Sequence, residues 1–476
     1  MPDSPFIRPI NWQINSYETW GVVGPNGSGK SLLAELMCGK IPVQSGKIHY
    51  HFLDKSAFPS RWIKKIDFNA AYSLLDYRKL FYQQRFNHSE YDSVPLVSEL
   101  FQLENISEEN RLIFRNFNLF DLMDRKFIHL SSGELRKLII AKTLLENPKM
   151  LIFDNPFIGL DEQSRVLLND IFAFLLMQRN IQLMFLAPTL GDLPACTTHI
   201  LKMKNCTVEY AGKMSGFTSE NVLTTDFISE INWNDITLEN RVCDSNEVVS
   251  MADVDIAYGK QVIQKAVNWN IYKNEKWALL GPNGSGKSTL LSYIFADNPQ
   301  AYAKNIRLFG RKRGTGESIW DIKKRIGFTS SELNLYYRKN ATSLAVIASG
   351  FFDSIGLFRK GNEQQILIAE KILEILRITH LKDRSFLKIS SGEQRLVLFA
   401  RAIIKNPQLL ILDEPFHGLD DYNKKMCTSI VESFAQQYDK SLIYVTHRME
   451  EIPDCIDHYK VLHRDEKADS ENEDTL

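Results

Sequence analysis

The chain has 476 residues, of which 44% are hydrophobic and 24% are charged, and its formal net charge is −1. These values exclude a wholly disordered or collagen-like chain, and the length predicts about two to four domains. The balanced charge favours neither nucleic acid nor an anionic membrane surface as a partner.

Cysteine usage and apolar runs predict a cytoplasmic protein. The six cysteines form no C-x-x-C pair and have no zinc-finger spacing, so we expect them to be reduced. The first ten residues, MPDSPFIRPI, lack the basic and apolar run of a signal peptide. The longest apolar runs, such as Ile171–Met177, are far shorter than the ~18 residues that span a bilayer. We therefore expect no membrane segment.

The first predicted elements are a strand at Trp20–Val23, the loop Gly24–Ser31 and a helix at Leu32–Met37. The loop sequence GPNGSGKS fits the phosphate-loop pattern G-x-x-x-x-G-K-[ST], in the strand-to-helix context that the pattern requires. Its glycines let backbone N–H groups face phosphate oxygens at a helix N-terminus, and its serine hydroxyl suits Mg²⁺. The predicted nucleotide-binding residues are Gly24, Asn26, Gly27, Gly29, Lys30 and Ser31.

Farther along, the run LIFDNP is typical of a buried parallel strand that ends in a carboxylate, Asp154. We expect Asp154 and Ser31 to hold Mg²⁺ together. The next residue is Asn155, which can position a water molecule but cannot accept its proton.

The second half of the chain repeats these motifs at a constant offset. Lys30 and Lys287 are 257 residues apart (287 − 30), and Asp154 and Asp413 are 259 apart (413 − 154). This repetition predicts two related domains. We place them at residues 10–212 and 247–464, joined by a polar, acidic linker at 213–246 and followed by a disordered acidic tail at 465–476, for which an interaction role is the alternative.

The second phosphate loop again lies between a strand, Trp277–Leu280, and a helix, Leu290–Phe295. Here Glu414 follows Asp413 and is placed to activate the attacking water, while Ser288 and Asp413 would hold Mg²⁺. The predicted nucleotide-binding residues of this loop are Gly281, Asn283, Gly284, Ser285, Gly286, Lys287, Ser288 and Thr289.

A further repeated motif, LSSGE at Leu130–Glu134 and ISSGEQ at Ile389–Gln394, resembles the signature of the ABC (ATP-binding cassette) ATPases. Each signature glycine precedes its strand-end aspartate by 21 residues (154 − 133 and 413 − 392). The resemblance implies an α/β fold with two tandem P-loop domains, each a mainly parallel sheet flanked by helices plus a helical subdomain, with ATP and Mg²⁺ bound. It also implies that His447 is the family's switch histidine; by itself, it is typical of an incidental histidine at a strand end.

In this family two cassettes pair head to tail, and each ATP lies between one phosphate loop and the other cassette's signature. The resemblance therefore adds two sets of binding residues, Ser131, Ser132 and Gly133, and Ser390, Ser391 and Gly392. The two sites are unequal, because Asn155 and Pro188 stand where the second domain has Glu414 and His447. We expect hydrolysis mainly at the second domain, with Glu414 and His447 as its catalytic residues.

Two other positions distinguish the domains from the family pattern. Tyr258 resembles the aromatic residue that stacks on adenine, although a structural strand tyrosine is the alternative, and the first domain has too few preceding residues to hold that element. The stretch Ile326–Ser331 has serine where the family's Q-loop glutamine is expected, which argues against conventional transport coupling. No residue reads the purine edge, so GTP stays an alternative to ATP.

Within the family, the segments Leu308–Gly314, Gly316–Lys324 and Phe352–Gly356 resemble the ModF-type, or photorepair-protein-like, tandem ATPases of bacterial molybdenum-transport loci. This implies a cytoplasmic double cassette, peripheral to the inner membrane, with a separate permease as partner. The alternatives are a soluble switch on a ribosome or nucleic acid, and a regulatory ATPase without a transport role. The basic clusters at 311–313 and 323–325 are more typical of solvent-exposed side chains than of a nucleic-acid-binding surface. We therefore expect no direct nucleic-acid binding.

Overall fold

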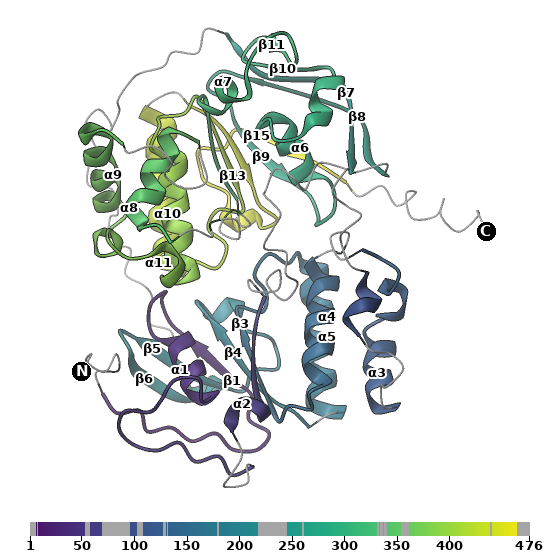
Figure 1. Ribbon diagram of the computed structural model, residues 1–476, viewed down its shortest axis with the longest axis vertical. Coiled ribbons are helices and arrows are strands. Elements are labelled where there is room, and N and C mark those ends of the chain that lie inside the picture. Colours follow the sequence, from purple (N-terminus) through teal and green to yellow (C-terminus); the bar gives the residue numbers. More distant parts are fainter. Residues whose placement is uncertain are drawn as a thin grey trace, which may run out of the picture. The chain divides into compact units, whose positions relative to one another are not determined.

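The computed structural model describes residues 6, 8–52, 58–68, 96–101, 108–126, 130, 132–178, 180–217, 245–258, 261–330, 333, 337, 340–353, 361–437 and 440–463. The chain divides into two compact units (Figure 1). The first holds the described residues up to Arg78 and between Asp92 and Leu223, with the short segment Gly418–Tyr422; the second holds those between Thr224 and His417 and from Asn423 onward. No helix in this described part is long and apolar enough to cross a membrane.

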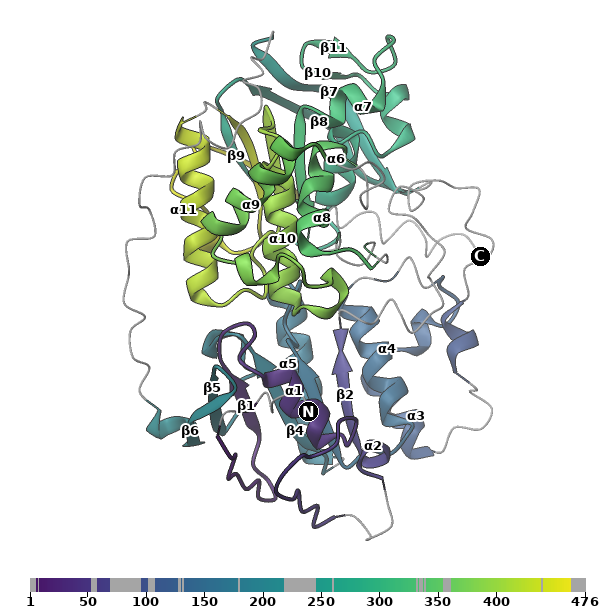
Figure 2. The same ribbon diagram turned by 60° about the vertical axis from the view of Figure 1, so that its left-hand side comes forward.

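The first unit is built on a six-stranded sheet in the order β2-β3-β4-β1-β5-β6 (Figure 2). The first five strands in this order, β2, β3, β4, β1 and β5, are parallel to one another. The last strand, β6, is antiparallel to β5. The strands are β1 (Trp20–Val23), β2 (Ile63–Asp67), β3 (Met150–Asp154), β4 (Gln182–Ala187), β5 (His199–Lys204) and β6 (Thr207–Lys213). The helices are α1 (Lys30–Met37), α2 (Pro59–Trp62), α3 (Glu108–Asn116), α4 (Ser132–Leu144) and α5 (Glu162–Gln178).

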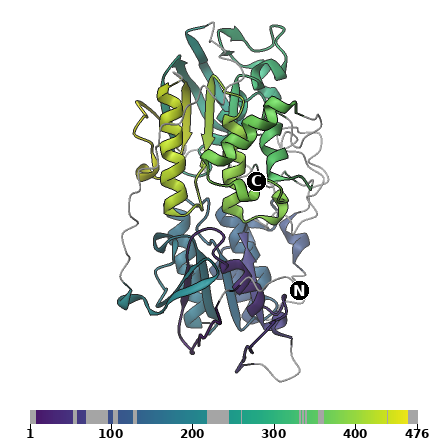
Figure 3. The same ribbon diagram turned by 90° about the vertical axis from the view of Figure 1, so that its left-hand side faces the viewer.

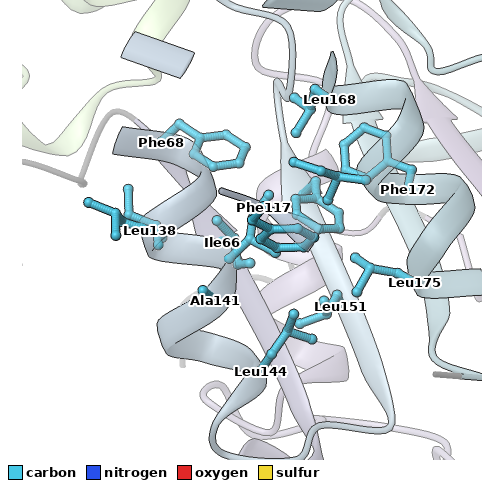
Figure 4. Packing of buried hydrophobic residues seen from close by; sticks show 14 of the residues in the cluster. Ile66, Phe68, Phe117, Leu138, Ala141, Leu144, Leu151, Leu168, Phe172 and Leu175 are labelled. Atoms are coloured by element: carbon cyan, nitrogen blue, oxygen red, sulfur yellow. The ribbon is translucent and has the colours of Figure 1, made fainter. Parts of the chain in front are cut away.

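Strand β3 is covered on both faces, which explains its unbroken apolar sequence. Ile152 belongs to a cluster that includes the buried face of α1, whereas Phe153 belongs to the cluster formed with α4 and α5 (Figure 4). Phe172 of α5 belongs to the second cluster, with its ring centroid 4.9 Å from Phe153 and 4.8 Å from Phe185 of β4. The strand that ends at Asp154 is therefore fixed by packing from both sides.

The second unit contains a five-stranded parallel sheet, β12-β13-β14-β9-β15, and a separate antiparallel sheet, β11-β10-β7-β8. Helices α8, α9 and α10 lie together as its helical part (Figure 3). The strands are β7 (Glu247–Tyr258), β8 (Gln261–Tyr272), β9 (Lys276–Leu280), β10 (Ile306–Leu308), β11 (Arg311–Lys312), β12 (Ile326–Ser330), β13 (Leu409–Asp413), β14 (Ser441–Val445) and β15 (His458–Val461). The helices are α6 (Lys287–Ile294), α7 (Ile319–Lys323), α8 (Ser343–Ala348), α9 (Glu363–Ile375), α10 (Ser391–Ile403) and α11 (Asp421–Gln437).

The duplication extends to side-chain contacts at the base of the central strand. Trp20 stacks on His199 with centroids 5.0 Å apart, and Trp277 stacks on His458 at 4.8 Å. In each unit the indole Nε1 donates to a glutamate two residues earlier, at 2.9 Å. Because the two units share both backbone order and these contacts, the predicted α/β tandem fold is confirmed.

The units differ in front of their phosphate loops. Residues 8–19 contain no strand, whereas the second unit places the long β7–β8 hairpin before β9. Residues 218–244 of the predicted linker, the whole predicted tail and Ser331 lie outside the described residues.

Candidate functional site

The two phosphate loops require glycine at their first position. Gly24 has φ 157°, and a Cβ atom there would lie 2.0 Å from the carbonyl oxygen of Met203. The matching Cβ at Gly281, with φ 149°, would lie 2.4 Å from the carbonyl oxygen of Leu462. These approaches are too close for any side chain, so the backbone can pass only because both residues are glycine.

Each loop encloses its lysine. Lys30 Nζ donates to the carbonyl oxygens of Gly24 at 2.6 Å and Pro25 at 2.9 Å. Lys287 Nζ makes the corresponding bonds to Gly281 and Pro282, at 2.6 and 2.8 Å. Burial lowers the pKa of Lys30 to about 8, although the Asp154 carboxylate opposes that shift. The predicted binding lysines therefore lie inside the loops that would hold the phosphates.

The residue after each strand-end aspartate has an unusual backbone. Glu414 has φ 47° and donates its N–H to Val445 of β14 at 2.9 Å, and Asn155 has φ 51° and donates to Leu186 of β4 at the same distance. This left-handed conformation is uncommon for residues other than glycine, asparagine and aspartate. Its retention by a glutamate indicates that the position of the Glu414 side chain is fixed by its surroundings.

Two histidines hold the Glu414 carboxylate. His447 Nδ1 lies 3.1 Å from Oε1, and His417 Nδ1 lies 3.4 Å from Oε2. Burial alone would raise the pKa of Glu414, but the hydrogen bonds from the two histidines hold it well below its usual value. Burial lowers the pKa of His417 to about 4, so this ring is neutral at pH 7. Glu414 is thus ionised and oriented, as a proton acceptor must be.

His417 is a site residue that sequence reasoning missed. It lies only three residues after Glu414, and this short separation within DEPFHGLD was the available signal. The predicted catalytic pair, Glu414 and His447, comes from segments 33 residues apart, and the structure brings the two side chains together. His447 Nε2 is buried and has no hydrogen-bond partner among the described residues, which leaves it available to a ligand.

The matching positions of the first unit carry none of these three groups. Asn155, Ile158 and Pro188 correspond to Glu414, His417 and His447, each at an offset of 259 residues. Asn155 Nδ2 donates to Asp154 Oδ1 at 3.2 Å, and its own Oδ1 is buried without a partner among the described residues. At these three positions, the first unit therefore has no side chain that can accept a proton from water.

A second residue missed from the sequence, Lys65 of β2, lies at the first unit's strand-end aspartate. Lys65 Nζ is 2.8 Å from Asp154 Oδ2, and Ser31 Oγ donates to the same oxygen at 3.0 Å. Burial would lower the pKa of Lys65, but the Asp154 carboxylate outweighs this effect and raises it. Lys65 is thus a cation at the position predicted to bind Mg²⁺.

The two predicted magnesium positions differ in their chemistry. In the second unit, the Ser288 hydroxyl on α6 and the Asp413 carboxylate at the end of β13 are the oxygen ligands that Mg²⁺ prefers. In the first unit, Ser31 and Asp154 are brought together as predicted, but the Asp154 carboxylate is already paired with an ammonium group. The side-chain types of the second unit suit Mg²⁺, whereas in the first unit the Lys65 ammonium group already pairs with the carboxylate that would bind it.

The second signature lies at the start of α10. Ser390 is its N-cap: the Ser390 side chain accepts from the N–H of Glu393 at 3.3 Å, and the Glu393 carboxylate accepts from the N–H of Ser390 at 2.8 Å. This capping box leaves the first helical amides, including those of Ser391 and Gly392, at a positive helix end that suits phosphate.

The other predicted binding residues are only partly described. Gly133 lies in the first turn of α4, but Ser131 lies outside the described residues, as do the side chains of Ser132 and Tyr258. Their predicted contacts with ATP therefore stay predictions.

Comparison with known proteins places these features among related chains. The family described as ABC transporter matches residues 7–158 and again residues 264–417. The chain is 33% identical to the ABC transporter ATP-binding protein ModF of Escherichia coli (strain K12) over 468 residues, covering 96% of this chain and 94% of that protein. It is 27% identical to an uncharacterized ABC transporter ATP-binding protein of Schizosaccharomyces pombe, covering 95% of this chain and 93% of the relative.

Among solved structures, the fold is similar to two that contain the archaeal protein ABCE1. One is its complex with the ribosomal stalk protein aP1, with a TM-score of 0.53, 17% identity, and coverage of 94% of this chain and 83% of that one. The other is a ribosome-bound complex with Pelota, with a TM-score of 0.58, 17% identity, and coverage of 94% and 72%. At this identity the likeness concerns the fold alone.

Proposed function

Since this chain belongs to the ABC transporter family and carries two of its ATPase cassettes, we propose that ATP is hydrolysed mainly at the second cassette. The observation that carries the proposal is the Glu414 carboxylate, held between His417 and His447. The first cassette has Asn155 in place of this base. We propose that its site binds nucleotide without hydrolysing it.

The side chains of the second cassette divide the work of hydrolysis. The loop amides and Lys287 bind and orient the phosphates, and Ser288 and Asp413 would hold Mg²⁺, which supplies positive charge to the phosphate oxygens. Glu414 accepts the proton of the attacking water through Oε1 or Oε2 while the two histidines keep it ionised. His447 Nε2, which has no partner among the described residues, is free to bind a terminal phosphate oxygen.

We propose that the two cassettes pair head to tail, so that Ser131, Ser132 and Gly133 complete the second site and Ser390, Ser391 and Gly392 complete the first. The resemblance of the signatures supports this arrangement. The capped start of α10 also supports it, because a helix N-terminus with free amides stabilises a phosphate group.

Vanadate trapping tests where hydrolysis occurs. The full chain is incubated with Mg²⁺, vanadate and a photoreactive 8-azido-ATP labelled on its α-phosphate, and the labelled peptides are mapped by mass spectrometry. Vanadate holds the product at a site that has turned over, so vanadate-dependent label is expected in residues 247–464. Vanadate-dependent label confined to residues 10–212 would overturn the assignment.

The partner is a second proposal, carried by a relative. The similarity to ModF along nearly the whole chain supports a role as the cytoplasmic ATPase of an ABC transport system, and the ModF-type resemblance suggests a molybdate system. In that role a separate membrane permease would be the partner.

Affinity capture tests this partner. The Glu414→Gln protein, loaded with ATP, is recovered from its native cells and its companions are identified by mass spectrometry, with the unaltered chain loaded with ADP as the control. ATP-dependent recovery of an integral membrane permease is the expected result. Recovery of ribosomes instead would replace the transport proposal with the ribosome-switch alternative and leave the site chemistry unchanged.

A further inference from the structure

We propose that the first cassette binds its nucleotide without a divalent metal, because Lys65 supplies the positive charge that Mg²⁺ supplies elsewhere. The inference rests on the proposed function, since it concerns the non-hydrolysing nucleotide site. The ligand of that site would be a nucleoside triphosphate or diphosphate without a bound metal ion. Lys65 would be the residue that gives the site this specificity.

The position of Lys65 follows from the sheet. Strand β2 lies beside β3, and the two strands are parallel. Lys65 of β2 is paired with Ile152 of β3, and Ile152 precedes Asp154 by two residues. On a strand, side chains two residues apart share a face, so Lys65 lies on the same face as Ile63, which packs in the cluster with α1. Its ammonium group thereby reaches Asp154, next to the phosphate loop, and the two side chains are only 10% and 11% exposed.

The Asp154 carboxylate has three donors at its two oxygens. Oδ2 accepts from Lys65 Nζ at 2.8 Å and from Ser31 Oγ at 3.0 Å, and Oδ1 accepts from Asn155 Nδ2 at 3.2 Å. A divalent cation at Ser31 and Asp154 would have to displace a buried ammonium group or lie beside it, and both arrangements are unfavourable because like charges repel strongly where water is excluded.

The second cassette has no basic residue at this strand position. Its strand β12 pairs with β13 in the same register, which places Phe328 where the first cassette has Lys65. Phe328 stacks on Phe295 with ring centroids 4.5 Å apart. An aromatic ring carries no positive charge, so Phe328 cannot take the role that Lys65 has in the first cassette.

The two sites should therefore respond differently to a chelator. A triphosphate at the first site would bind next to Lys30 of the loop. Asp154 would not repel it, because the Lys65 ammonium group already neutralises that carboxylate. At the second site no lysine stands at the strand position of Lys65, and Ser288 and Asp413 would hold Mg²⁺ beside the triphosphate. The first cassette could then keep its nucleotide through changes in free Mg²⁺ that empty the second.

Equilibrium binding of ATP tests the proposal. The reference protein, called the parent, is the full chain with Lys287→Ala. This substitution removes the phosphate-binding lysine of the second site, so the ATP binding that remains measures the first site. Binding of radiolabelled ATP is measured in excess Mg²⁺ and in excess EDTA, and we expect dissociation constants within about threefold of each other. In this background, Lys65→Met should weaken binding in EDTA by about tenfold or more, with Mg²⁺ restoring it.

Lys64→Met is the matched control. Lys64 is the adjacent residue on β2, points to the opposite face and forms its ion pair with Glu146, so its replacement removes the same charge without touching Asp154. Binding by this variant should stay independent of Mg²⁺. Equal effects of the Lys64 and Lys65 changes would overturn the proposal.

The parent measurement decides the matter even if Lys65→Met fails to fold. A parent that binds ATP only with Mg²⁺, or that binds none in either condition, would overturn metal-free binding. Vanadate trapping keeps this result separate from the proposed function, because it reports which cassette hydrolyses ATP whatever the metal requirement of the first site.

Discussion

Replacing Glu414 with glutamine should lower steady-state ATP hydrolysis by the full chain about 10²–10⁴-fold, the range expected when a general base is lost. The amide keeps the size of the carboxylate and can still receive a hydrogen bond from His447, but it cannot accept a proton from water. The phosphate loop around Lys287 is unchanged, so ATP should stay bound. Phosphate release measures turnover, and rapid gel filtration of the same sample measures retained ATP.

Asn155→Gln is the control for this substitution, because it changes the matching position of the first cassette. Hydrolysis should change by less than about twofold, since no general base is removed there. His417→Ile, which introduces the residue found at position 158, should give an intermediate loss of about tenfold from one missing hydrogen bond to a charged group. If the changes at Glu414 and Asn155 slowed hydrolysis equally, the assignment of unequal sites would be wrong.

Phe172→Ala should destabilise the first unit by about 3–5 kcal/mol, the usual cost of emptying an aromatic position in a core. Phe172 is fully buried on α5, and its ring packs against both Phe153 and Phe185. Figure 4 shows it on the same helix as Leu168 and Leu175, which belong to the same cluster. The cavity would lie directly under the strand that ends at Asp154.

Met177→Ala on the same helix is the control, because this side chain is 83% exposed and its removal should change stability by less than about 0.5 kcal/mol. Hydrogen exchange followed by mass spectrometry is the suitable measurement, since a chain of two units need not unfold in one step. Protection should fall in β3 and β4 of the Phe172 variant and stay unchanged in β13 and β14. Unchanged protection of β3 in that variant would show that Phe172 does not stabilise this core.

The parts of the site that the sequence predicts well are contiguous motifs. The two GPNGSGKS loops and the strands ending at Asp154 and Asp413 can be identified because each motif carries its chemistry within eight residues and occurs between a strand and a helix. The constant offset between the copies then predicts the tandem α/β fold. The pairing of Glu414 with His447 needed the family resemblance, because nothing local joins two segments 33 residues apart.

The missed residues depend on how strands are placed side by side. Lys65 is one lysine among many in the sequence, and only the parallel register of β2 against β3 brings it to Asp154. His417 lies inside a loop whose path determines whether it faces Glu414 or solvent. Sequence periodicity predicts which face of a strand is buried, but it does not identify the neighbouring strand, so such contacts appear only in the folded chain.

The left-handed backbone shared by Asn155 and Glu414 has an evolutionary consequence. Asparagine adopts this conformation more readily than glutamate, so a change from glutamate to asparagine in the first cassette would relieve backbone strain of about 1 kcal/mol while removing the base. The reverse change would restore the strain without restoring activity, because Ile158 and Pro188 provide neither supporting histidine. The proposed loss of catalysis in the first cassette is therefore a step that single substitutions do not readily undo, and the proposed division of roles between the two copies would persist once established.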